Sequence, residues 1–111
     1  MFVTGNMDNG KLGLGSAWSS GLLLNFTHNE QLQKVKYVAC GPNHMLAITD
    51  NKLDSTDPRS GIYACGLNSR GQLGIGNKED QNDPKKIPNL KEKFKKVVCG
   101  QNFSMGLTTN N

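Results

Sequence analysis

Thiols and imidazoles are the side chains of this sequence best suited to metal binding or nucleophilic catalysis. Cys40, Cys65 and Cys99 are 25 and 34 residues apart, a spacing typical of neither a disulfide framework nor the close pairs of a zinc site. We expect reduced, buried thiols. His28 lies in a polar segment, and no Ser/His/Asp or Cys/His arrangement accompanies it or His44. The sequence therefore predicts no catalytic residues, no metal site, no cofactor and no enzyme activity of its own.

Phosphate binding is the second chemistry to consider, because a glycine-rich segment spans residues 5–15. Its glycines follow the order G-x-x-G-x-G, without the Gly-Lys-Ser/Thr ending of a phosphate loop and without a following helix pattern. Glycines at fixed offsets indicate backbone positions with positive φ or close chain approach. We therefore interpret this segment as turn architecture.

Lysines form the third candidate. The net charge is +4, and residues 51–111 contain ten basic and six acidic residues. A solvated rim is the first interpretation, because edge strands carry Lys against unwanted pairing. The alternative is a patch for phosphate or an acidic partner. Few aromatic residues and only two Arg argue against base readout, so nucleic acid is a weak candidate partner. The candidate basic patch comprises Lys85, Lys86, Lys91, Lys93, Lys95 and Lys96.

The elements that must position these residues are short strands. The chain has 111 residues, 35% hydrophobic content and 13 Gly, which favours an all-β domain rich in tight turns. No apolar run approaches the roughly 20 residues of a membrane-spanning helix, and the first residues lack the pattern of a signal peptide. We expect a cytoplasmic or nuclear protein that is neither secreted nor membrane-bound.

An internal repeat decides the architecture. Residues 5–15 recur 61 positions later as residues 66–76, and Val38–Asn43 recurs 59 positions later as Val97–Asn102. We expect the shared residues to have a structural role in the repeat. They are Gly5, Gly10, Leu12, Gly13 and Gly15 in the first loop, Gly66, Gly71, Leu73, Gly74 and Gly76 in the second, and Gly41 and Gly100 in the other block.

Strand-length apolar runs alternate with these loops. We predict repeat blocks over residues 1–49 and 62–109, joined by an exposed loop over residues 50–61, which is rich in Asp and Ser. The predicted strands are Met1–Thr4, Val35–Cys40, Met45–Thr49, Ile62–Cys65 and Val97–Cys99.

The sequences GLNSRGQLGIG (66–76) and VACGPNHMLAIT (38–49) together resemble the repeat of the regulator of chromosome condensation family. The resemblance implies β-propeller blades of four antiparallel strands, as part of a seven-bladed propeller. It predicts one full blade, with Val35–Cys40, His44–Thr49, Ile62–Cys65 and Lys86–Ile87 as its strands. Residues 1–32 would then give the last two strands of the preceding blade, and residues 94–109 the first two of the next.

The resemblance places His44 at the histidine of the family repeat, where we expect a structural role with a hydrogen bond to a neighbouring backbone turn. Phe103 replaces this histidine in the second copy. Trp18 follows the first glycine loop, and we expect it to be an anchor beneath that loop.

Two repeats cannot close a ring, because propellers have about four to eight blades, and repeat proteins depend on interfaces between neighbouring units. We expect residues 1–111 to be a partial propeller, completed by the remaining blades of a longer chain or by other copies of itself. Three copies would supply about six blades and four copies about eight.

The resemblance implies three functions: guanine-nucleotide exchange on a small GTPase of the Ran type, chromatin association, and protein-interaction scaffolding. A fold alone does not choose among them. We expect a non-catalytic scaffold module that binds proteins, because loops on a rigid ring suffice for that role. Nucleotide exchange on a small GTPase is the alternative.

Overall fold

A computed structural model describes residues 1–50 and 59–110 of this chain. Those residues form eight strands and two short 3₁₀ helices. None of the helices among them is long and apolar enough to cross a membrane. The elements are β1 (Phe2–Asn6), η1 (Asp8–Gly10), η2 (Ser16–Trp18), β2 (Leu22–His28), β3 (Val35–Cys40), β4 (His44–Thr49), β5 (Gly61–Gly66), β6 (Gln81–Lys86), β7 (Phe94–Cys99) and β8 (Ser104–Thr108).

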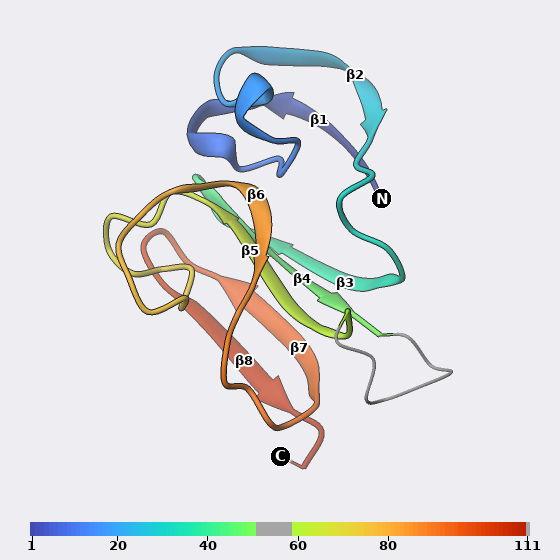
Figure 1. The fold of residues 1–111 in the computed structure, drawn as a ribbon, viewed down its shortest axis with the longest axis vertical. Coiled ribbons are helices and arrows are strands. Elements are labelled where there is room, and N and C mark those ends of the chain that lie inside the picture. The colour runs from blue at the N-terminus through green and yellow to red at the C-terminus, as the bar shows by residue number, and fades with distance from the viewer. Residues whose placement is uncertain (51–58, 111) are drawn as a thin grey trace.

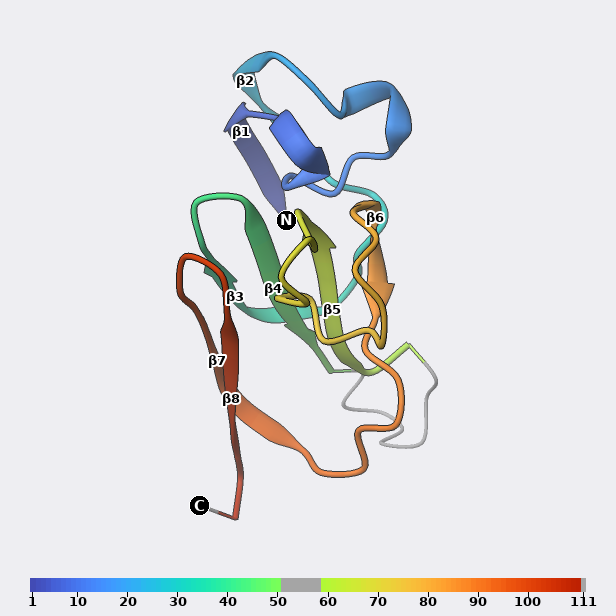
Figure 2. The same ribbon diagram turned by 90° about the vertical axis from the view of Figure 1, so that its left-hand side faces the viewer.

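The strands form three antiparallel sheets. The central sheet has the order β3-β4-β5-β6, and the two-stranded sheets β1-β2 and β7-β8 lie on either side of it (Figures 1 and 2). By their place in the repeat, β1-β2 corresponds to β5-β6, and β7-β8 corresponds to β3-β4. The structure confirms the predicted all-β architecture of one full blade flanked by two half-blades.

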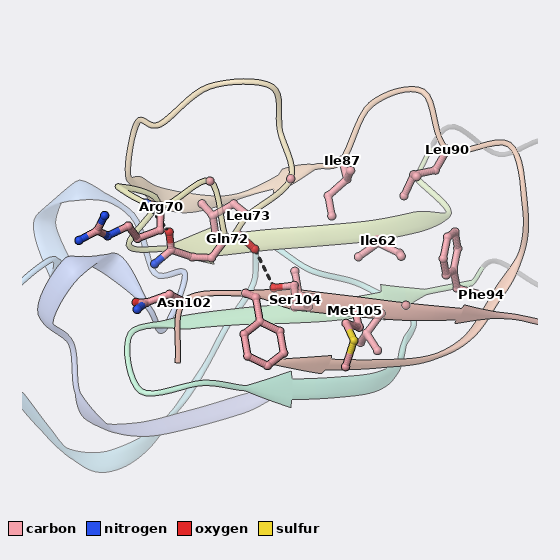
Figure 3. Close-up of a pocket in the computed structure, with 16 residues that line it drawn as sticks. Ile62, Arg70, Gln72, Leu73, Ile87, Leu90, Phe94, Asn102, Ser104 and Met105 are labelled. Atoms are coloured by element: carbon pink, nitrogen blue, oxygen red, sulfur yellow. Dashed lines mark hydrogen bonds between the residues drawn. The ribbon is translucent and has the colours of Figure 1, made fainter. Parts of the chain in front are cut away.

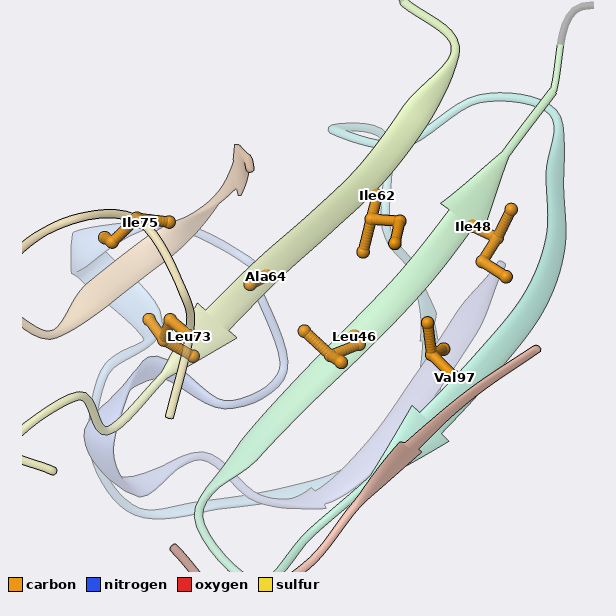
Figure 4. Close-up of a cluster of buried hydrophobic side chains, with 7 residues drawn as sticks. All are labelled: Leu46, Ile48, Ile62, Ala64, Leu73, Ile75 and Val97. Carbon is orange, nitrogen blue, oxygen red and sulfur yellow. The ribbon is translucent and has the colours of Figure 1, made fainter. Parts of the chain in front are cut away.

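The core of the blade is built on β4 and β5. All six residues of β4 are buried, because this strand has a neighbour on each edge and a cluster of side chains on each face. One cluster comprises Leu46, Ile48, Ile62, Ala64, Leu73, Ile75 and Val97 (Figure 4). The cluster on the other face comprises Leu32, Met45, Ala47 and Cys65.

The fourth strand of the blade differs from the prediction. It runs over Gln81–Lys86 rather than Lys86–Ile87, and the Ile87 N–H then donates to the Ile62 carbonyl at 2.8 Å. Its sequence QNDPKK has no apolar alternation and contains Pro84, so it does not resemble a strand. An outer strand tolerates both features, since one edge needs no hydrogen-bonded partner.

Two further expectations are wrong. Trp18 is 43% exposed in η2 and is not a buried anchor, because η2 lies at the surface of the loop without a buried residue. Cys40 is exposed, whereas Cys65 is buried and Cys99 is half-buried. Cys40 is the last residue of β3, which lies at one edge of the central sheet. Among the described strands, β3 pairs only with β4. The predicted loop 50–61 falls mainly on residues 51–58, which lie outside the described residues.

Candidate functional site

His44 begins β4 and is buried against the neighbouring half-blade. Its Nε2 lies 3.0 Å from Ser104 Oγ, and Ser104 Oγ donates its hydrogen to the Gln72 carbonyl at 2.7 Å. The serine hydroxyl has a single hydrogen, so His44 Nε2 must donate to Oγ. Burial lowers the pKa of His44, which fits a neutral ring. A smaller, opposing effect on this pKa comes from the Phe103 backbone in the neighbouring turn, and the bond to Ser104 is a side-chain bond across two blades that was not predicted.

This arrangement leaves His44 without free catalytic capacity. Its Nε2 is engaged by Ser104, and its buried Nδ1 has no hydrogen-bond partner among the described residues. A general base needs a nitrogen that reaches substrate, whereas both ring nitrogens of His44 are enclosed. We assign His44 to holding the β7-β8 hairpin on the blade.

The cysteines have the electrostatics of structural thiols. Burial, with smaller effects from neighbouring groups, raises the pKa of Cys65 to about 12. Burial also raises the pKa values of Cys40 and Cys99. Reactive cysteines have lowered pKa values. Among the described residues there is no group of three or more His, Cys, Asp or Glu side chains that could hold a metal ion.

The glycine loops are turns that use their own backbone donors. In the second loop, the Gly71 N–H donates to the Asn68 carbonyl at 2.9 Å and the Gly74 N–H donates to the Gly71 carbonyl at 3.1 Å. These two donors therefore do not cradle a phosphate. All eight glycines predicted in the loops have positive φ.

Asn68 holds the second loop together and was not predicted as a site residue. It is fully buried. Its Nδ2 donates to the Asn77 carbonyl at 3.0 Å and the Glu79 carbonyl at 2.9 Å, and its Oδ1 accepts from the Leu73 N–H at 3.1 Å. Asn68 has Met7 as its counterpart in the first loop, so comparison of the two copies gave no signal for it.

A groove lies between the blade and the β7-β8 half-blade. Its volume is about 380 Å³. Its floor is apolar, and Gln72, Asn102 and Ser104 lie toward the glycine-loop end (Figure 3). Its apolar lining residues include Leu46, Ile62, Leu73, Ile87, Leu90 and Phe94.

The structure places the six predicted lysines at the end of β6, in the connection to β7 and at the start of β7, all exposed. This connection joins the strand ends opposite to the glycine loops, as Figure 1 shows. The lysines therefore share one end of the molecule, but they stand on two different sheets. The glycine loops occupy the other end with the turns at residues 41–43 and 100–103.

Comparison with known proteins agrees with this geometry. Two models of the regulator of chromosome condensation (RCC1) repeat match residues 35–72 and 60–107. Protein RCC2 homolog of Xenopus laevis is 43% identical over 70 residues, covering 62% of this chain and 12% of that protein. The human X-linked retinitis pigmentosa GTPase regulator is 35% identical over 112 residues, covering 97% of this chain and 10% of that protein. The chain spans about a tenth of the length of these relatives.

Solved structures show the same fold. Prp20p from Saccharomyces cerevisiae matches with a TM-score of 0.77 and 20% identity, over 98% of this chain and 27% of Prp20p. Human WBSCR16 matches with a TM-score of 0.71 and 23% identity, over 97% of this chain and 26% of that protein. Repeat sequence, blade topology and structural likeness agree, and the chain belongs to the family of regulator of chromosome condensation (RCC1) repeat proteins.

Proposed function

We propose that this chain is a non-catalytic protein-interaction module that offers the ends of propeller blades to a partner. The observation that carries the proposal is a contrast between polar side chains in the interior of the molecule and charged side chains at one of its ends. Buried His44 and Asn68 and half-buried Ser104 are engaged in holding loops and blades, while exposed lysines gather at one end. Loops on a rigid scaffold are the usual place for binding residues.

The lysine end suits an acidic protein segment. Lys91 and Lys93 lie in the β6-β7 connection, and Lys95 is the second residue of β7. All three side chains are exposed. Clustered exposed cations attract an anionic partner and speed its association. The scarcity of Arg and aromatic residues in this region favours an acidic peptide over nucleic-acid bases.

A deca-glutamate peptide and a mixed-sequence DNA duplex test this surface. We expect the peptide to bind in fluorescence anisotropy with an affinity that falls as salt rises. The double variant Lys93→Glu/Lys95→Glu should reduce that affinity at least tenfold. Arg70→Glu/Lys78→Glu, which makes the same charge change at two exposed residues of the glycine-loop connection between β5 and β6, serves as the control. Equal peptide binding by both variants, or tighter binding of the DNA than of the peptide, would refute this assignment.

Nucleotide exchange on a small GTPase is the second candidate. It is supported by the likeness to Prp20p, which has been studied for its binding to Gsp1p and histones, and to a protein named as a GTPase regulator. The test is release of a fluorescent GDP analogue from a Ran-type GTPase. No acceleration by the chain, with retained peptide binding, supports the scaffold role. Acceleration would favour the exchange function. Either role fits an intracellular setting, cytoplasmic or nuclear.

A further inference from the structure

The edges of β8 and β1 are among the strand edges that have no strand partner within the described residues. β8 pairs only with β7, and β1 pairs only with β2. In the full blade the corresponding strands, β4 and β5, pair with each other in antiparallel fashion. We propose that β8 of one copy pairs with β1 of a second copy, so that β7-β8 and the second copy's β1-β2 complete a four-stranded blade. This inference concerns assembly of the chain itself and is separate from the acidic partner.

The repeat defines the register of this pairing. In the full blade Ala47 stands opposite Tyr63, a small residue against an aromatic one. Gly106 occupies the place of Ala47, and Phe2 occupies the place of Tyr63. The new pair is therefore Gly106 opposite Phe2 of the second copy, which keeps the combination of a small and an aromatic residue. Such cross-strand pairs stabilise sheets.

The packing of Tyr63 in the full blade shows which residues Phe2 would contact in the new one. Tyr63 packs on the second core cluster with Leu32, Met1 and Val35. Leu90 is the repeat counterpart of Leu32, because Leu32 is the fourth residue after β2 and Leu90 is the fourth residue after β6.

The groove contains the repeat counterparts of these contacts. Ile62 corresponds to Met1, Phe94 to Val35 and Leu90 to Leu32, and all three line the groove. Leu32 is 4% exposed, whereas Leu90 is 42% exposed. The aromatic ring of Phe2, itself 63% exposed, would cover Leu90 and occupy part of this groove. The side chain that fits the groove thus belongs to the same sequence that forms the groove.

The glycine loops support the same arrangement. The first loop lies tightly on β6, so that a Cβ at Gly13 would be 2.9 Å from the Pro84 ring. At Gly74, its counterpart in the second loop, the only neighbour of a Cβ would be Ile87 Cδ1 at 4.0 Å. β2 is the counterpart of β6, and its side chains Leu24 and Phe26 are highly exposed. β2 of the second copy would lie along the second loop, and its apolar face would be covered there.

The first experiment measures mass against concentration by light scattering after size exclusion. We expect association of the wild-type chain and at least a tenfold weaker association of Phe26→Asp, which buries a charge in the new interface. Asn25→Asp is the matched control: it adds the same charge on the opposite face of β2 and should associate like the wild type. The Phe26 side chain is exposed in the single chain, so its replacement should not disturb folding. Circular dichroism should show both variants folded.

The second experiment tests the register. In the full blade Leu46 stands opposite Ala64, and the same relation places Met105 opposite Val3 of the second copy. Mixed Met105→Cys and Val3→Cys proteins, each carrying Cys40→Ser, should form a disulfide-linked pair. Met105→Cys mixed with Thr4→Cys should not, because side chains of adjacent strand residues point to opposite faces.

Three outcomes would overturn the proposal. They are a wild-type chain that stays monomeric at every concentration, an association unaffected by Phe26→Asp, and equal cross-linking to positions 3 and 4. A monomeric chain would mean that β8 and the groove are covered by further repeats of a longer polypeptide. Peptide binding at the lysine end does not depend on any of these results.

Discussion

The imidazole Nε2 of His44 lies 3.0 Å from the hydroxyl Oγ of Ser104, 60 residues further along the chain. His44 begins a strand of the full blade, and Ser104 begins a strand of the next half-blade. The same hydroxyl donates to the Gln72 carbonyl in the glycine loop. One serine therefore joins two blades and a loop.

Replacing Ser104 by Ala should destabilise the chain by about 1–3 kcal/mol, because the buried His44 donor and the Gln72 carbonyl both lose a partner. Denaturant unfolding measures the change at a fixed protein concentration. Ser20→Ala, at an exposed serine, is the control and should change stability by less than about 0.5 kcal/mol. A Ser104→Ala protein as stable as this control would contradict the role given to the hydroxyl.

Acid should destabilise the fold through His44. Burial lowers its pKa in the folded state, so below about pH 6.5 the unfolded chain binds the proton more readily than the folded one. Stability should therefore decrease as pH falls from about 6.5 toward the folded-state pKa, by at most about 1.4 kcal/mol per pH unit. His44→Phe should remove this part of the pH dependence. Unfolding curves of both proteins with the same slope between about pH 5 and 7 would refute it.

Alkali should destabilise the fold through Cys65. Burial raises its folded-state pKa to about 12, so the folded chain keeps a proton that the unfolded chain releases. This contribution to stability is complete below the unfolded pKa and is lost as pH rises from about 9 toward 12. Cys65→Ala should be less stable at neutral pH, because a buried side chain is shortened. Its stability should nevertheless fall less steeply with alkali than that of the wild type, and parallel curves would exclude the thiol as the cause.

Gly10 and Gly71 form a matched pair for testing close approach. Their φ angles are +73° and +72°, but a Cβ at Gly10 would lie 2.6 Å from the Asn82 Cα, whereas one at Gly71 has open space. Gly71→Ala should cost about 1–2 kcal/mol for the left-handed backbone alone. Gly10→Ala should cost clearly more, because β6 must also move. Both are measured by denaturant unfolding with Phe26→Asp present to prevent association, and equal losses would contradict the difference in contact.

Much of the fold was predictable from local pattern. The strands β3, β4 and β5 have short apolar runs bounded by glycine or polar turns, and their bounds match or nearly match the predicted ranges, whereas only the second half of β7 was predicted as a strand. β6 was mostly missed, because an outer strand does not need apolar residues and accepts Pro84. The exposure of Trp18 was also missed, since sequence position does not show whether a loop side chain has a neighbour.

The candidate site was less predictable. The repeat identified the glycines, the family resemblance identified His44, and the lysine run was visible as a charge pattern. Ser104, Gln72 and Asn68 were not predicted, because their importance depends on which carbonyl or imidazole lies beside them. A polar residue acquires such a role only when burial removes water as its alternative partner.

The sequence by itself determined the repeat, the positions of its turns and the first three strands of the blade, and its family resemblance supplied the fourth. Recurring glycines fix backbone conformations locally, and apolar runs between them are long enough only for strands. Only the tertiary structure decided that His44 meets Ser104, that Leu32 is covered while Leu90 is not, and that an apolar groove lies between the blade and the β7-β8 half-blade. Contacts between blades join residues about 60 positions apart, and their geometry depends on how whole sheets pack, which no local pattern specifies.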